Sequence, residues 1–203
     1  FPASFVFLLR RQRQNHTEPP PSPPVVEPVV MMVSKERYAS EFVELERLGD
    51  GGFGTVHRSL NKLDSTEYAV KKIMGGSPET VLREVKILAS LDHPHIVRYY
   101  QAWLEERSED DDLMSEEEAS LYSSGGPLPE VSDLVLYIQM QLCSARTLRD
   151  RLEDRPANSF LDVTTTLEIF AQAARGLRYV HERGLIHRDL KPANFFFDGD
   201  TVK

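Results

Sequence analysis

The sequence is poor in cysteine, in clustered basic residues and in long apolar runs, and each shortage excludes a class of protein. Its 203 residues include one cysteine, Cys143, so no disulfide can form within the chain and a reducing compartment is expected. Lysine and arginine number 24 against 32 aspartate and glutamate residues, which argues against direct nucleic-acid binding by this segment. The apolar start at residues 1–9 is far shorter than the roughly 20-residue run of a membrane-spanning helix.

The net charge of −8 comes from one acidic run. Residues 105–118, EERSEDDDLMSEEE, hold nine carboxylates and one arginine, so the rest of the chain is close to neutral. Like charges repel, and the Gly and Pro residues that follow leave little to pack, so we predict a disordered acidic insert at about 106–131. Residues 1–38 contain the proline-dense stretch EPPPSPPVVEP, which predicts a disordered tail or linker.

Between these segments, the pattern is mostly that of short strands. Runs of β-branched and aromatic residues predict strands at 42–48, 55–61, 67–73, 96–103 and 134–141. Ser77 and Pro78 predict the start of a helix, and apolar residues at helical spacing follow them. A longer helix is expected from Asp162 to Arg183. The layout is a small sheet with one helix, followed by the beginning of a helical lobe.

The stretch LGDGGFGTV, from Leu48 to Val56, has glycines at a fixed spacing. Glycine lets a backbone come close to phosphate oxygens, so Gly49, Gly51 and Gly54 can form a flap over a nucleotide. A hairpin turn without a ligand and a dinucleotide-binding turn are the alternatives. The dinucleotide fold needs a helix directly after the glycines, whereas a strand-like segment follows here. This favours a hairpin that covers phosphates.

The predicted strand YAVKKI carries two adjacent lysines. Side chains alternate along a strand, so Lys71 shares a face with the small Ala69, whereas Lys72 points to the other face. Exposed lysines are common on strands, and that ordinary reading stays open. Glu84 favours a functional reading, because it borders the apolar stripe of the predicted helix, where an unpaired carboxylate is costly. We expect Lys71 to be its cationic partner.

The segment IHRDLKPAN holds the densest cluster of polar side chains. Asp189, Lys191 and Asn194 stand close together around Pro192, in a stretch without helical periodicity. In phosphoryl transfer onto a hydroxyl, Asp189 would orient the hydroxyl and accept its proton, and Lys191 would offset charge on the phosphoryl group. Asn194 would hold a magnesium ion. A polar loop that caps a helix is the alternative.

Taken together, these motifs resemble the protein-kinase signature. The chain resembles a eukaryotic serine/threonine protein kinase from about Phe42 to its last residue. The resemblance implies an α+β, bilobal kinase fold with a complete N-terminal lobe, made of a five-stranded antiparallel sheet and one helix, and an incomplete helical C-terminal lobe. The N-terminal lobe and hinge would cover 39–143, and the C-terminal lobe would run through the catalytic loop over 144–203. The family pattern continues with Asp-Phe-Gly shortly after this point, so we expect a truncated chain.

The resemblance also implies ATP and Mg²⁺ as cofactors and gives individual residues their roles. Asp189 would be the catalytic aspartate, Asn194 the magnesium ligand, and Lys191 is typical of the serine/threonine class. Met140 would be the gatekeeper before the hinge, and Phe196 would lie under the base. The full set implied in binding ATP is Leu48, Gly49, Gly51, Gly52, Gly54, Val56, Ala69, Lys71, Glu84, Met140, Gln141, Cys143 and Phe196.

Three segments are similar to the kinases that phosphorylate the alpha subunit of eukaryotic translation initiation factor 2. They are LYIQMQLC at 136–143, VRYYQAWLE at 97–105 and the acidic insert between their strands. The resemblance implies a kinase of that subunit in stress control of protein synthesis, with a possible homodimer through the N-terminal lobe. TLRD at 147–150 is similar to the amino-acid-starvation member, whereas YIQMQLC and NFFF are more similar to the endoplasmic-reticulum-stress member, so the member stays open.

An alternative function is that of a non-catalytic kinase fragment that binds nucleotide or pairs with a full-length kinase. A chain without the Asp-Phe-Gly segment would lose most of its phosphoryl-transfer rate, and apolar surface on the helix at 162–183 would lack part of its cover. We expect a cytoplasmic protein. If residues 1–9 are the end of a transmembrane helix, the arginines after them would mark the cytoplasmic face of the endoplasmic reticulum membrane, so membrane attachment stays open.

Overall fold

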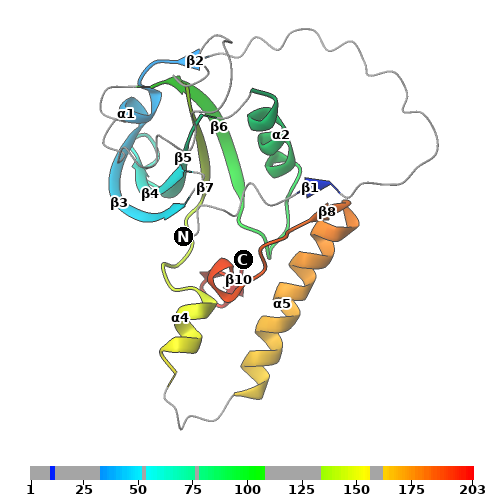
Figure 1. The fold of residues 1–203 in the computed structure, drawn as a ribbon. Coiled ribbons are helices and arrows are strands. Elements are labelled where there is room, and N and C mark those ends of the chain that lie inside the picture. Colours follow the sequence, from blue (N-terminus) through cyan, green and yellow to red (C-terminus); the bar gives the residue numbers. More distant parts are fainter. Residues whose placement is uncertain (1–9, 12–32, 52–53, 76–77, 108–133, 156–161) are drawn as a thin grey trace, which may run out of the picture.

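The chain folds into a strand-rich lobe and a helical region joined after strand β7 (Figure 1). In this computed structural model the described residues are 10–11, 33–51, 54–75, 78–107, 134–155 and 162–203. Nearly all of the predicted insert at 106–131 and most of the predicted tail at 1–38 lie outside them. The helical cap predicted at Ser77 also lies outside them.

A six-stranded sheet forms the strand-rich lobe, in the order β2-β6-β7-β5-β4-β3. The strands are β2 (Val33–Ser34), β3 (Phe42–Gly51), β4 (Gly54–Asn61), β5 (Glu67–Met74), β6 (Tyr99–Glu106) and β7 (Leu134–Gln141). Neighbours among β3 to β7 pair antiparallel, which confirms the predicted five-stranded sheet. The short β2 is an addition to the prediction, and it pairs parallel with β6 at the edge.

The strand predicted at 96–103 begins later than the sequence indicates, at Tyr99. Ile96 is buried, but in a cluster with Leu91, Val180 and Leu185 rather than in the sheet. The first residues of this apolar run therefore pack against the helical region, and only its later residues pair with β7 in the sheet.

Residues 33–38, predicted as part of the disordered tail, are ordered on the sheet. The short helix α1 (Arg37–Glu41) is a second helix of this lobe, where one was predicted. Its Tyr38 stacks on Phe42 and Tyr137 with ring centroids 5.7 and 5.0 Å apart, and the Tyr38 N–H donates to the Glu105 carboxylate at 2.7 Å. Aromatic packing of this kind depends on the folded sheet, so the local sequence did not reveal it. Strand β1 (Arg10–Arg11) lies in the same predicted tail and pairs with β8.

Alternation of side chains gives the sheet two different buried faces. On one face, helix α2 (Pro78–Ala89) packs its Leu88 against a cluster that includes Ala69 and Ile138. On the other face, Val70 and Tyr137 belong to an aromatic-rich cluster under α1. Residues next to each other along β5 therefore belong to separate cores.

The helical region contains α4 (Leu148–Glu153), α5 (Val163–Glu182), β8 (Leu185–Ile186), a 3₁₀ turn η5 (Pro192–Asn194), β9 (Phe197–Asp198) and β10 (Thr201–Val202). The predicted ends of the long helix are confirmed. Asp162 caps α5 by accepting from the Thr164 N–H at 3.1 Å, and Gly184 follows the helix with a φ of +67°. A positive φ suits glycine, so the stop signal has a direct structural cause.

The N-terminal half of α5 exposes apolar side chains. Val163, Leu167 and Phe170 are 63, 61 and 70% exposed, whereas Val180 near the other end is buried. This confirms that part of the apolar surface of this helix lacks cover in the described part of the chain. None of the described helices is both long and apolar enough to cross a membrane.

Gly176 in α5 allows a test of how the helix meets the strand-rich lobe. A Cβ at this position would lie 2.6 Å from the carbonyl oxygen of His95, which precedes β6. Alanine favours a helix over glycine by about 1 kcal/mol. We expect Gly176→Ala nevertheless to lower the free energy of unfolding by about 1–3 kcal/mol, because the backbone of the loop must shift. Urea denaturation measures the change.

The matched control is Ala174→Gly, at an exposed position of the same helix. It should cost about 1 kcal/mol through helix propensity alone. A stabilised Gly176→Ala variant would contradict the close contact between α5 and the loop at His95.

Candidate functional site

The glycine motif lies in the hairpin that joins β3 and β4. Gly51 pairs with Gly54 at the end of the ladder, and Gly52 lies outside the described residues. Gly54 has a φ of +116°, and a Cβ on it would lie 1.9 Å from the carbonyl oxygen of Lys72. Only glycine fits this position, so the hairpin backbone comes unusually close to β5.

An apolar surface lies on the strands that carry this hairpin. Val56, Ala69 and Met140 are buried in one cluster, and Leu48 packs against it. Gly49 pairs directly with Val56, so the first glycine of the motif lies beside this apolar cluster. The structure thus brings together five of the residues expected to bind ATP, and an apolar surface beside polar backbone suits a flat heteroaromatic ring.

Lys71 and Glu84 are both buried, with 1 and 5% of their surfaces exposed. Burial lowers the pKa of Lys71 and raises the pKa of Glu84, and the Coulomb attraction between the two groups opposes both shifts. The two residues therefore interact electrostatically across the space between β5 and α2. Lys72 takes the other face of β5, as predicted, and its Nζ lies 3.0 Å from the Glu44 carboxylate.

The segment after β7 connects the two parts of the molecule. The side chain of Gln141 donates to the Asp198 carboxylate at 2.7 Å, and the Ser144 N–H donates to the Phe197 carbonyl at 2.7 Å. Both bonds fix this segment to β9 of the helical region. Cys143 between them is buried, and burial raises the pKa of its thiol to about 12.

The polar segment between β8 and β9 brings Asp189, Lys191 and Asn194 into contact. One carboxylate oxygen of Asp189 accepts from Lys191 Nζ at 2.9 Å and from Asn194 Nδ2 at 2.9 Å. Asn194 also donates to the Asp189 carbonyl at 2.6 Å. The Lys191 ammonium and the Asn194 amide hold the pKa of Asp189 below its usual range, so it is a carboxylate at neutral pH.

The other end of the Asn194 side chain has a different environment. Its Oδ1 atom is buried and accepts no hydrogen bond from the described residues. A buried oxygen without a partner is costly, and an amide oxygen is a hard ligand of the kind Mg²⁺ prefers. The residue therefore fits the metal role expected for it. The described part of the chain contains no group of three or more His, Cys, Asp or Glu side chains that could hold a metal ion by itself.

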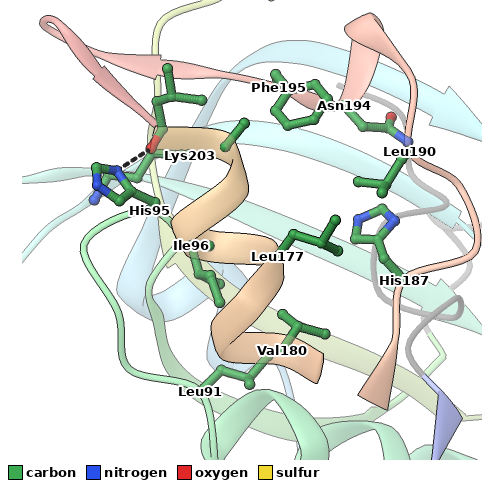
Figure 2. Close-up of a pocket in the computed structure, with 13 residues that line it drawn as sticks. Leu91, His95, Ile96, Leu177, Val180, His187, Leu190, Asn194, Phe195 and Lys203 are labelled. Carbon is green, nitrogen blue, oxygen red and sulfur yellow. Dashed lines mark hydrogen bonds between the residues drawn. The ribbon is translucent and has the colours of Figure 1, made fainter. Parts of the chain in front are cut away.

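Residues around a small pocket support the polar segment on the side of α5; among them His187 and Asn194 are buried, and Leu190 is half exposed. Figure 2 shows Asn194, His187 and Leu190 facing Leu177 of α5 around a pocket of about 50 Å³. His187 accepts the Asp189 N–H at 3.3 Å, and burial lowers its pKa. These contacts orient the backbone at Asp189 from the side of α5.

Phe196, expected under the base, is 3% exposed. Its backbone N–H donates to the Lys203 carbonyl at 3.1 Å and its carbonyl accepts from the Lys203 N–H at 3.0 Å. It therefore lies at the base of the β9–β10 hairpin. His95 donates from Nδ1 to the Val202 carbonyl at 3.1 Å and so ties this hairpin to the loop before β6 (Figure 2).

A group of polar residues on the opposite face of the sheet has no counterpart among the predicted site residues. His57 Nε2 shares a hydrogen bond with the Thr55 hydroxyl there, and His57 Nδ1 lies within ion-pair distance of the Glu44 carboxylate. The signal in the sequence is the series of polar residues at alternate positions of β4, Thr55, His57 and Ser59, all of which are buried.

The buried pair allows a test of stability. Glu84→Leu leaves the Lys71 ammonium without its carboxylate neighbour, and Lys71→Met leaves the Glu84 carboxylate without its cation. We expect each single substitution to lower the free energy of unfolding by about 3 kcal/mol. The double variant should recover most of this loss, because an apolar pair of similar volume replaces the charges. Urea denaturation of all four proteins gives the coupling, and strictly additive losses would contradict an electrostatic link.

Comparison with known proteins identifies the family. Residues 42–203 match the model of the protein kinase domain. The chain is 38% identical over 161 residues to the interferon-induced, double-stranded RNA-activated protein kinase of Rattus norvegicus, across 79% of this chain and 29% of that protein. It is 39% identical over 180 residues to the eIF-2-alpha kinase GCN2 of Arabidopsis thaliana, across 80% of this chain and 14% of that protein.

A third relative, the Wee1-like protein kinase 1-A of Xenopus laevis, is 38% identical over 182 residues, across 86% of this chain and 27% of that protein. The chain thus spans less than a third of the length of each of these relatives. The family model covers most of the chain, and the matched residues include the glycine hairpin, the buried lysine and the Asp189 segment. The chain belongs to the eukaryotic serine/threonine protein kinase family.

Proposed function

We propose that the protein is an active, ATP-dependent serine/threonine kinase whose substrate is the alpha subunit of translation initiation factor 2. The proposed catalytic activity rests on one observation: Lys191 and Asn194 hold Asp189 as an oriented carboxylate. A carboxylate fixed by two donors can receive a substrate hydroxyl at its remaining oxygen positions, which is what phosphoryl transfer to serine or threonine requires.

The proposed roles follow from the position of each residue. The glycine hairpin would cover the phosphates, Lys71 would contact them, and the apolar surface at Ala69 would receive the adenine. Asn194 would hold Mg²⁺ through its Oδ1 atom. Magnesium-bound ATP supplies the phosphoryl group and the positive charge that offsets it. Asp189 would orient the substrate hydroxyl and accept its proton, while the ammonium of Lys191 stabilises negative charge on the moving group.

The proposed substrate is supported by similarity. One relative, from Arabidopsis thaliana, is named as an eIF-2-alpha kinase, and the segments at 97–105 and 136–143 are similar to that class. Wee1-like kinases match at nearly the same identity, so overall identity alone does not single out the eIF-2-alpha kinases among these relatives. A direct comparison of substrates is therefore needed.

The catalytic roles can be tested in the protein as expressed from its own gene. Lys71→Met and Asp189→Asn should each reduce phosphoryl transfer by at least about 100-fold, because the first removes a phosphate contact and the second removes the proton acceptor. The measurement is transfer of labelled phosphate from magnesium-ATP to a protein substrate.

Two exposed residues provide matched controls. Lys62→Met and Asp200→Asn make the same chemical changes at turns of the surface and should keep the rate within about twofold. Near-normal transfer by Asp189→Asn would show that the carboxylate is not the proton acceptor.

The substrate can be tested with purified alpha subunit of the initiation factor and, in parallel, with an unrelated protein that carries accessible serine, threonine and tyrosine residues. We expect kcat/KM to favour the alpha subunit by at least about 100-fold, because recognition of a folded substrate adds several favourable contacts. Phosphoamino-acid analysis should find phosphoserine or phosphothreonine. Equal or faster phosphorylation of the unrelated protein, or phosphotyrosine as the main product, would overturn the proposed substrate.

A further inference from the structure

A continuous chain of polar contacts joins β3, β4 and β5 on the face of the sheet away from α2. One oxygen of the Glu44 carboxylate lies 2.9 Å from His57 Nδ1, and the other lies 3.0 Å from Lys72 Nζ. On its far side, His57 Nε2 lies 3.0 Å from the hydroxyl of Thr55. His57 and Thr55 are 8 and 9% exposed, so the hydrogen bond between them is shielded from water, whereas the Glu44 side chain is 40% exposed.

The protonation state of Glu44 fixes the direction of the hydrogen bonds. The contact with His57, followed by the contact with Lys72, lowers the pKa of Glu44 to about 2. The Tyr38 hydroxyl also donates to this carboxylate, at 2.9 Å. An ionised carboxylate only accepts, so Nδ1 of His57 carries a proton. In the neutral ring, Nε2 then accepts from the Thr55 hydroxyl.

The aromatic face of the sheet holds the charged end of this chain in place. Lys72 Nζ lies 4.6 Å from the ring centroid of Tyr38 and 5.9 Å from that of Tyr137. A cation over these rings gains further attraction. Glu44 therefore cannot turn toward solvent without giving up the contacts to His57, Lys72 and Tyr38 together.

The other end of the chain is the base of the glycine hairpin. Thr55 directly follows Gly54 and pairs with Asp50 on β3 and with Lys72 on β5. Lys72 contacts both the hairpin and the polar chain, because its carbonyl lies against Gly54 while its ammonium binds Glu44. Its neighbour on the opposite face of β5 is Lys71. The polar chain thus connects the two backbone segments that would meet the phosphates.

We propose that the Glu44–His57–Thr55 chain holds the glycine hairpin at a fixed position over the nucleotide, so that His57 is a positioning residue for ATP. The inference rests on the proposed kinase function. A phenylalanine also places a flat ring at this position, so packing alone does not require histidine at this buried place. The hydrogen bond at Nε2 and the close contact of Nδ1 with the Glu44 carboxylate give the histidine its specific effect. The three residues belong to β3 and β4 on the face of the sheet away from α2, whereas Asp189 follows β8 in the helical region, so we expect the effect on ATP binding and not on transfer.

The test compares ATP binding with turnover in single variants. His57→Phe and Thr55→Val should each raise KM for ATP about fivefold, since each removes a hydrogen bond that holds the hairpin, while kcat stays within about twofold. The double variant should match the single ones, because both break the same chain. His57→Gln should restore most of the affinity, since its amide can donate to Glu44 and accept from Thr55. His181→Phe, at an exposed position of α5, is the matched control and should leave KM unchanged.

A second readout does not depend on turnover. Amide hydrogen exchange of residues 49–56, measured without nucleotide, should become about fivefold faster in His57→Phe and should return toward the wild-type rate in His57→Gln. Thermal unfolding confirms that each variant is folded. An unchanged KM and unchanged exchange in folded His57→Phe would overturn the proposal, and so would failure of His57→Gln to restore either value. If the wild-type protein binds no nucleotide, the proposed kinase function fails, and hydrogen exchange still decides whether the chain holds the hairpin.

Discussion

Side chains alternate across a strand, so the two adjacent lysines of β5 enter opposite faces of the sheet and make different contacts. Lys71 enters the core under α2, where Glu84 offsets part of the cost of its burial. Lys72 enters the opposite face, where Glu44 and the ring of Tyr38 receive it. A shift of the β5 register by a single residue would exchange the two lysines, and both faces of the sheet would lose their arrangement at once.

Local patterns predicted most of the fold. Strands β3, β4, β5 and β7 follow from alternating β-branched and aromatic residues, and α5 follows from its cap at Asp162 and its stop at Gly184. The errors share one cause. Strand β2, helix α1 and the late start of β6 depend on contacts made only after folding, such as Tyr38 on Tyr137 and Ile96 in the cluster with Val180. The neighbouring residues in the sequence do not indicate which distant residues these segments contact.

The residues of the site likewise include some that the sequence predicted and others that it did not. Asp189 and Asn194 lie five positions apart, so a short segment brings them together, and their motif could be read directly. The chain from Glu44 to His57 could not be read, because the β3–β4 pairing is irregular between Glu44 and Glu46 and again between Arg47 and Gly49. Each irregularity changes which residues face one another across the hairpin. Simple alternation therefore gives the wrong partners for this part of the sheet.

Cys143 has a further consequence for how the molecule can be observed. It is the only cysteine in the sequence, and it lies buried in the segment that joins the two parts of the fold. Because the pKa of the Cys143 thiol is raised, almost no thiolate is present at neutral pH. The thiol therefore reacts very slowly with electrophiles as long as this segment keeps Cys143 buried. Alkylation at this position would therefore proceed at the rate of local opening, and the protein carries its own single-site reporter of hinge motion.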